Sequence, residues 1–133
     1  MGIRYEKDTI LNWINEIGKF LRLLVDKREG MHAVETAAVD VEAGYMDFFG
    51  KDRAFFQELS DNDLLAFVED LDPKKIRPLA LLLMHDGFLN KQALLLSKAK
   101  FLLENQMRIT GEFSFEDYAY LADIDKQLKL LES

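Results

Sequence analysis

Apolar residues recur along most of this chain at the three- and four-residue spacing that places side chains on one face of an α-helix. The first such segment covers residues 8–27 and carries the stripe Ile10, Ile14, Ile17, Leu21 and Leu24. Asp8 at the start of this segment is a typical N-cap, and Gly30 behind it is a typical helix stop. The pattern therefore predicts a first helix from about Asp8 to about Lys27.

A second apolar stripe follows over residues 31–49 and consists of Met31, Val34, Ala38, Val41, Tyr45 and Phe48. Gly50 comes directly after it and suits the left-handed residue that commonly follows the end of a helix. We expect one continuous helix here, followed by a short aromatic stretch with Phe55 and Phe56.

Four further helices are predicted over residues 60–71, 73–87, 90–108 and 114–131. Ser60 and Ser114 are each followed three residues later by an aspartate, which is close to the capping-box pattern of a helix start. Asp72 and Pro73 form an N-cap and first-turn pair, and Gly87 is expected to end the helix that they begin. No alternation of apolar and polar residues extends over the length of a strand, so the sequence predicts an all-α fold.

The helices over residues 73–87 and 90–108 contain the apolar runs Leu79–Met84 and Leu94–Leu96, which surround the helix axis. Such helices are covered on more than one side. We therefore predict that they form a central pair in a two-layer antiparallel array of about six helices. Helices 60–71 and 114–131 lie against this pair, and the first two helices cap it. The length of 133 residues predicts a single domain, residues 1–133.

The central hairpin, followed by a helix with Tyr118 and Leu121 three residues apart, resembles the helical hairpins of tetratricopeptide-type (TPR) repeats. That resemblance implies a surface that binds peptides or partner proteins. Pro73 and Phe115 open successive units 42 residues apart where the repeat has 34, and the Trp-Leu-Gly mark of the repeat is missing. The first helix also resembles that of a family of small uncharacterised bacterial helical proteins, a resemblance that implies no activity.

The net charge of −7 comes from the middle third of the chain. Residues 31–72 carry two Lys/Arg and eleven Asp/Glu, whereas the segments on either side each carry one excess positive charge. Nucleic-acid binding is disfavoured because it depends on clustered Lys and Arg. The acidic segment is either a solvated face or a docking surface for a basic partner.

The composition is that of a globular protein from a reducing compartment. The chain has no Cys, which excludes disulfides, thiolate nucleophiles and cysteine-based zinc sites and fits a cytoplasmic location. The first residues form no apolar signal segment. The longest apolar run, Leu79–Met84, is about a third of the length that a bilayer span needs. We expect a cytoplasmic protein without a membrane role.

Candidate chemistry is sparse because His32 and His85 are the only imidazoles. With Glu35 and Asp86 they form the one constellation that could hold a metal or act in acid–base chemistry. Carboxylate-bridged helical metal sites repeat a Glu-x-x-His pattern, whereas this chain has His-x-x-Glu once. We therefore expect no metal and no cofactor. The alternative function is a small metal-dependent or acid–base enzyme that uses these four residues.

A basic trio lies in the first turn of the helix over residues 73–87, where the helix dipole disfavours cations. The trio consists of Lys74, Lys75 and Arg77. Two arrangements would offset this cost. One is pairing with the acids just before it, Glu69, Asp70 and Asp72, and the other is an anionic ligand.

The surface best suited to binding is the edge of the first helix that carries Trp13 and Phe20. Seven residues apart, they widen the apolar arc to about half the circumference, more than a helix packed on one side needs. This edge is either extra core or a contact patch, and the aromatic series from Tyr45 to Phe56 is likewise core or groove. We predict a non-enzymatic domain that binds a protein partner, or itself as a homodimer, through apolar helix faces.

Overall fold

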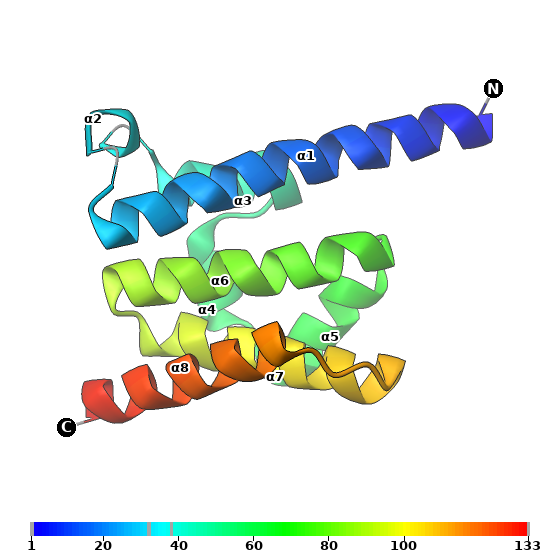
Figure 1. Ribbon diagram of the computed structural model, residues 1–133. Helices are drawn as coiled ribbons and strands as arrows, with labels where there is room; N and C mark the ends of the chain where they lie inside the picture. The colour runs from blue at the N-terminus through cyan, green and yellow to red at the C-terminus, as the bar shows by residue number, and fades with distance from the viewer. Residues whose placement is uncertain (1, 32, 38, 133) are drawn as a thin grey trace. The chain divides into compact units, whose positions relative to one another are not determined.

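Helices make up all of the regular secondary structure in the described part of the chain, so the predicted all-α class is confirmed (Figure 1). The computed structural model describes residues 2–31, 33–37 and 39–132. Its elements are α1 (Gly2–Glu29), α2 (Ala33–Thr36), α3 (Val41–Phe49), α4 (Arg53–Glu58), α5 (Asp61–Glu69), the 3-10 turn η1 (Pro73–Lys75), α6 (Ile76–Asn90), α7 (Ala93–Thr110) and α8 (Phe115–Glu132).

The chain divides into two compact units, residues 1–53 and 54–133. In the first unit, α1 packs against α2 and α3. In the second unit, α6 and α7 form a hairpin, and α8 packs against both of them. The predicted central pair of helices is therefore present. The capping of this pair by the first two helices, the single domain over residues 1–133 and the TPR-like arrangement stay predictions.

The start of α1 differs from the sequence prediction. The helix begins at Gly2 rather than at Asp8. Arg4, Glu6 and Lys7 are strong helix formers, and no proline separates them from the apolar stripe. The helix therefore extends about 1.7 turns beyond the predicted N-cap Asp8.

The predicted continuous helix over residues 31–49 is wrong, because the chain forms α2 and α3 instead. After Thr36 the backbone turns, and the Val39 N–H donates to the Thr36 carbonyl at 3.1 Å. The Asp40 carboxylate then accepts a hydrogen bond from the Ala43 N–H at 3.2 Å. This N-cap starts a new helix, which the unbroken apolar stripe concealed.

The predicted serine caps are confirmed. Ser60 Oγ accepts from the Asp63 N–H at 3.1 Å before α5, and Ser114 Oγ accepts from the Asp117 N–H at 3.0 Å before α8. Asp72 also acts as a cap, but it caps η1, which leads directly into α6. The aromatic stretch around residues 55 and 56 forms α4, a helix that the apolar pattern alone does not predict.

Gly87 does not end α6, contrary to the prediction. The helix continues to Asn90, and Lys91 ends it in the left-handed conformation, with φ at 54°. Gly87 is buried at the contact between α6 and α7. A Cβ placed on it would lie 2.7 Å from Leu96 Cγ and 3.1 Å from the Leu96 backbone nitrogen. The glycine is therefore needed for close helix packing near the hairpin turn.

The apolar run of α6 is enclosed, since every side chain from Leu79 to Met84 is buried. In α7, Leu95 and Leu96 are buried, but Leu94 is 59% exposed, so the apolar run does not surround this helix as predicted. For α8, helical periodicity predicts the buried stripe Tyr118, Leu121, Ile124, Leu128 and Leu131. Ile124 is buried, but Tyr118 is largely exposed. The core of the second unit is therefore centred on α6.

Leu82→Ala and Leu95→Ala should each lower the free energy of unfolding by about 2–5 kcal/mol, because both side chains are completely buried and truncation leaves a cavity. Leu94→Ala is the matched control in the same helix, and its exposed side chain should cost less than about 0.5 kcal/mol. Urea denaturation followed by circular dichroism measures all three. Equal losses for Leu94→Ala and Leu95→Ala would contradict this assignment of the core.

Gly87→Ala and Gly18→Ala should change stability in opposite directions. At Gly87 the added methyl meets the backbone of Leu96 and should cost about 1–3 kcal/mol. At Gly18, inside α1, no atom other than those of its chain neighbours and the adjacent backbone of its own helix lies within 4 Å of the added Cβ, so the better helix propensity of alanine should add up to about 1 kcal/mol. Thermal melts of the two variants beside the parent protein give the signs. Stabilisation by Gly87→Ala would show that α6 and α7 are not held this closely.

Candidate interaction surface

The connection between α7 and α8 is short and fixed by local hydrogen bonds. Gly111 takes the left-handed conformation after α7, and its N–H donates to the Met107 carbonyl at 2.9 Å. The Thr110 hydroxyl accepts from the Glu112 N–H at 3.1 Å, and Ser114 caps α8. These hydrogen bonds fix the backbone conformation of the loop over residues 111–114.

Large apolar side chains are exposed on both sides of this loop. Phe113 is 61% exposed and Phe115 is 95% exposed, and Tyr118 stacks on Phe113 with ring centroids 6.0 Å apart. We call Phe113, Phe115 and Tyr118 the aromatic corner. Ile109, 70% exposed near the end of α7, adds to the apolar surface. Three aromatic residues exposed within six positions are unusual, because such side chains are normally buried.

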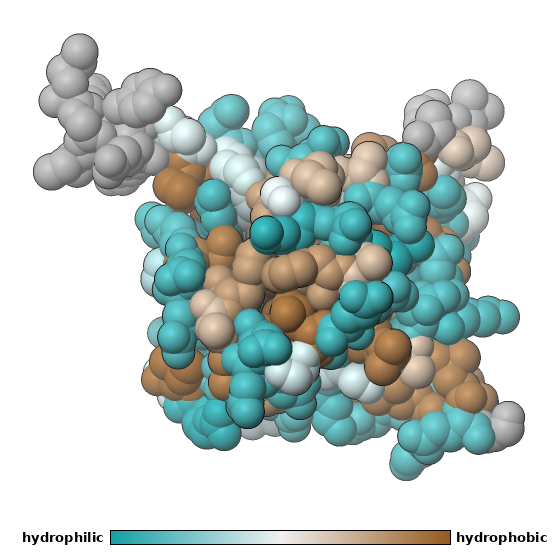
Figure 2. Space-filling model, turned by 180° about the vertical axis from the view of Figure 1, so that it is seen from behind, coloured by the Kyte–Doolittle hydropathy of each residue, from teal (hydrophilic) through white to brown (hydrophobic). Residues whose placement is uncertain are grey.

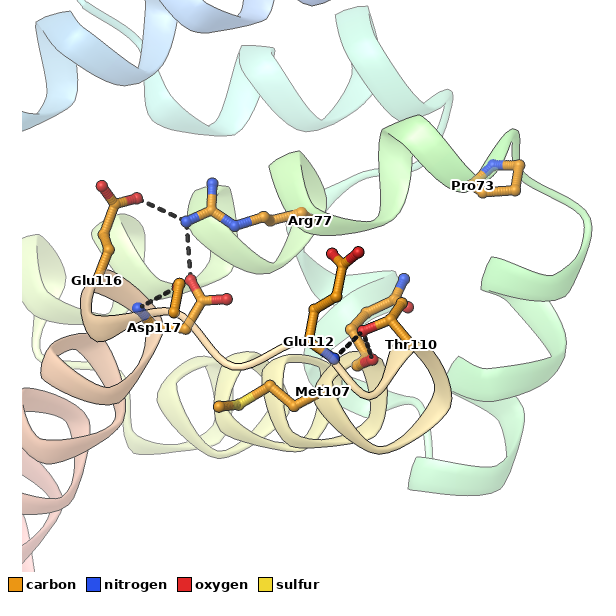
Figure 3. A pocket seen from close by; sticks show the side chains of 9 residues that line it. Pro73, Arg77, Met107, Thr110, Glu112, Glu116 and Asp117 are labelled. Atoms are coloured by element: carbon orange, nitrogen blue, oxygen red, sulfur yellow. Dashed lines mark hydrogen bonds and ion pairs between the residues drawn. The ribbon is translucent and has the colours of Figure 1, made fainter.

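A pocket of about 480 Å³ lies beside the aromatic corner, between the start of α6 and the α7–α8 loop (Figure 3). Arg77 enters it from α6, and its guanidinium lies 2.6 Å from Glu116 Oε1 and 2.8 Å from Asp117 Oδ1. Glu112 lines the pocket as well. With one guanidinium against three carboxylates, the pocket carries excess negative charge and is unsuited to an anion.

The partners of Arg77 correct one expectation from the sequence. They lie 39 and 40 residues further along the chain, not among the acids that directly precede the basic trio. Burial lowers the pKa of Arg77, but its hydrogen bonds to Asp117 and Glu116 outweigh this effect, and the pKa is raised. Arg77 therefore stays charged and joins α6 to the first turn of α8, where carboxylates also suit the helix dipole.

Two further polar contacts hold α8 in place. Lys100 of α7 pairs with Asp125 at 2.8 Å, and this hydrogen bond raises the pKa of the ammonium group. Tyr120 lies 6.0 Å from the Arg77 guanidinium carbon, measured to the ring centroid. Burial and the neighbouring Glu116 carboxylate raise the pKa of the Tyr120 phenol. The first turns of α8 are thus fixed to the α6–α7 pair.

Trp13 and Phe20, the interaction residues expected from the sequence, lie in the first unit and contact α3. The Trp13 indole N–H donates to the Phe48 carbonyl at 3.2 Å, and its ring packs edge-on against Phe48 and Phe49. Phe20 packs beside Phe48 and over Gly44. Both side chains are half-buried and hold α1 to α3. Their expected role in binding a partner stays a prediction.

The aromatic series from Tyr45 to Phe56 is partly core. Tyr45 and Phe56 are completely buried, and Phe49 is 8% exposed. Phe48 and Phe55 are half-buried. In α4, Phe55 and Phe56 pack on Phe67 of α5 with ring centroids within 5.5 Å. These buried rings stabilise the two units from within.

The four residues of the enzyme hypothesis are only partly described. His32 and the side chain of Glu35 lie outside the described residues. His85 and Asp86 are buried in α6, and the Asp86 carboxylate accepts a hydrogen bond from the Asn90 amide at 2.6 Å. Within the described part of the chain, no three His, Asp or Glu side chains gather as metal ligands would.

The aromatic corner is not among the interaction residues expected from the sequence, although the sequence contains a signal for it. Phe113 and Phe115 flank the capping residue Ser114, and a helix N-terminus usually lies at the surface. Helical periodicity alone predicts that Tyr118 belongs to the buried stripe of its helix. Aromatic residues beside a capping serine are thus better candidates for exposure than those in the middle of a helix.

Compared with protein-family models, curated proteins and solved structures, the chain matches none. Among the described helices, none combines the length and the hydrophobicity of a membrane-spanning segment.

Glu116→Gln should lower the pKa of Tyr120, because the carboxylate is one of the groups that raise it. Absorbance at alkaline pH follows the phenol, and Tyr120→Phe identifies its contribution among the four tyrosines. The folded state binds the Tyr120 phenol proton more tightly than the unfolded chain does. The free energy of unfolding should therefore fall as the pH rises above about 10. Asp123→Asn, an exposed carboxylate elsewhere on α8, is the control and should leave the titration unchanged. An unchanged pKa of Tyr120 in the Glu116→Gln variant would contradict the interaction between Glu116 and Tyr120.

Proposed function

We propose that this protein is a non-enzymatic interaction domain that binds another protein chain through the aromatic corner. One observation carries the proposal: Phe113, Phe115 and Tyr118 are each more than half exposed, on a loop and helix start that local hydrogen bonds hold rigid. A preorganised aromatic surface binds with little loss of conformational freedom. Aromatic residues also dominate the binding energy of protein interfaces.

Charge beside the aromatic corner indicates the chemistry of the partner. The neighbouring pocket has its single guanidinium already paired with two carboxylates, and Glu112 adds a third negative group. Such a surface repels anions and attracts ammonium or guanidinium groups, which also interact favourably with aromatic rings. The bound surface therefore combines basic and apolar side chains.

The setting expected from the sequence belongs to the same proposal. A reducing cytoplasm fits a chain without Cys, and a bacterial origin is what the resemblance of the first helix implies. The resemblance of residues 73–131 to TPR-type hairpins supports a binding role, because those hairpins bind peptides and proteins. The edge with Trp13 and Phe20 is a second candidate surface, and its half-burial against α3 makes it the weaker one.

The double variant Phe113→Ser/Phe115→Ser should reduce association with other protein chains at least about tenfold, because two large apolar contacts are lost. Its helicity and melting temperature should stay close to those of the parent, since both side chains are exposed. The measurements are sedimentation velocity for self-association and affinity capture from an extract of the native cell with each protein as bait.

Met46→Ser/Leu94→Ser is the matched control. Its two side chains are 53% and 59% exposed, and they lie on α3 of the first unit and at the start of α7, outside residues 109–118. This control should bind as the parent does. Equal loss of binding in both double variants would indicate nonspecific hydrophobic association. Unchanged binding by Phe113→Ser/Phe115→Ser would overturn the proposal.

A further inference from the structure

The exposed face of α8 has an internal symmetry about Ala122. Phe115 and Lys129 lie seven residues on either side of Ala122, and Tyr118 and Lys126 lie four residues on either side. In an α-helix, positions four and seven residues away from a given residue share its face. All five residues are exposed. One half of the face is therefore aromatic, and the other half carries two ammonium groups.

This face points away from the core of the second unit. The opposite side of α8 contributes the buried Ile124, and Asp125, at the edge of the face about 60° from Ala122, pairs with Lys100 of α7. At the centre of the exposed face, Ala119 and Ala122 present only methyl groups, which let another helix approach closely. The lysine half is not purely charged, because Leu130 is 61% exposed. Figure 2 shows, on the side seen from behind, hydrophobic patches among the hydrophilic surface.

An antiparallel copy of the same helix complements this arrangement. With a two-fold axis beside Ala122, Phe115 of one copy faces Lys129 of the other, and Tyr118 faces Lys126. Symmetry repeats each contact. An ammonium group against an aromatic ring is attracted to the ring face, and the apolar stem of the lysine covers the ring. Glu112, Glu116 and Asp117 exceed Arg77 in charge near the aromatic end, so the arriving lysines also meet a net negative field.

We infer that the occupant of the aromatic corner is a second copy of this chain, docked antiparallel along α8 with the two-fold axis at Ala122. The inference rests on the proposed function and names its partner. A second copy supplies a surface that is both basic and apolar, formed by Lys126, Lys129 and Leu130. The two-fold axis at Ala122 brings this surface opposite the aromatic half of α8.

A single engineered cysteine tests the register, because the chain has none of its own. Ala122→Cys places two thiols at the axis, where two closely packed helices bring their Cα atoms within disulfide distance. Asp123→Cys, one residue further and about 100° round the helix, is the matched control. Under mild oxidation, Ala122→Cys should form a covalent dimer at least about ten times faster than Asp123→Cys. Adding Phe115→Ser/Tyr118→Ser should abolish that difference.

Charge reversal tests the contacts themselves. Lys126→Glu/Lys129→Glu should weaken dimerisation in sedimentation equilibrium at least about tenfold, because four lysine–aromatic contacts are lost across the axis. Lys19→Glu/Lys74→Glu changes the net charge equally at two other exposed lysines and should leave the dimer intact. Helicity measured by circular dichroism should be the same in both variants.

Three results would overturn the inference. The first is a wild-type protein that stays monomeric at high concentration, the second is equal crosslinking of the two cysteine variants, and the third is equal weakening by the two charge reversals. The capture experiment with Phe113→Ser/Phe115→Ser distinguishes failure of the homodimer hypothesis from failure of the proposed function. A monomer whose aromatic corner captures a different protein refutes only the second copy, whereas a corner variant that captures everything the parent does refutes both.

Discussion

Helices α6 and α7 approach each other so closely at Gly87 and Leu96 that one Cβ would not fit between them, and the second unit is arranged around that contact. The close approach buries consecutive side chains of α6 from Leu79 to Gly87. A helix enclosed over more than two turns gives the other elements a firm surface to pack on. Leu95 and Leu96 complete that core from α7, while Leu94 next to them stays at the surface.

Arg77 connects the buried helix α6 to α8 at the surface of the second unit. Its guanidinium binds Glu116 and Asp117 in the first turn of α8, and Ser114 caps the same turn. The direction in which α8 leaves the loop is thus fixed by a charged pair and a backbone hydrogen bond. Phe113, Phe115 and Tyr118 are exposed on a rigid support, so their exposure is not the result of a loosely held chain end. The symmetric face of α8 follows from the same anchoring.

The sequence predicted most of the helices because local signals fixed them. Ser60, Asp72 and Ser114 each cap a helical segment near the predicted place, and the apolar run of α6 is buried as expected. The errors occurred where one residue type has two structural uses. A glycine serves as a helix stop or as a close-packing site, and only the position of Leu96 shows that Gly87 is the second kind. Likewise, an unbroken apolar stripe does not reveal the turn before Asp40.

The candidate site was less accessible to sequence reasoning than the fold. Trp13 and Phe20 stood out by size and spacing, yet their contacts with α3 depend on a helix boundary that the stripe did not show. Arg77 finds its partners 39 and 40 residues away, and no local pattern specifies that distance. Aromatic exposure at residues 113–118 depends on how α8 is anchored, which is a tertiary property.

The single tryptophan makes the first unit separately observable. Trp13 packs edge-on against Phe48 and Phe49 and donates its indole proton to the Phe48 carbonyl, all within residues 1–53. Its emission therefore reports the packing of α1 on α3, whereas the far-ultraviolet ellipticity sums over every helix. Heating the protein while recording both signals measures the cooperativity between the two units without any label, since coincident transitions belong to one folding unit and separated transitions to two.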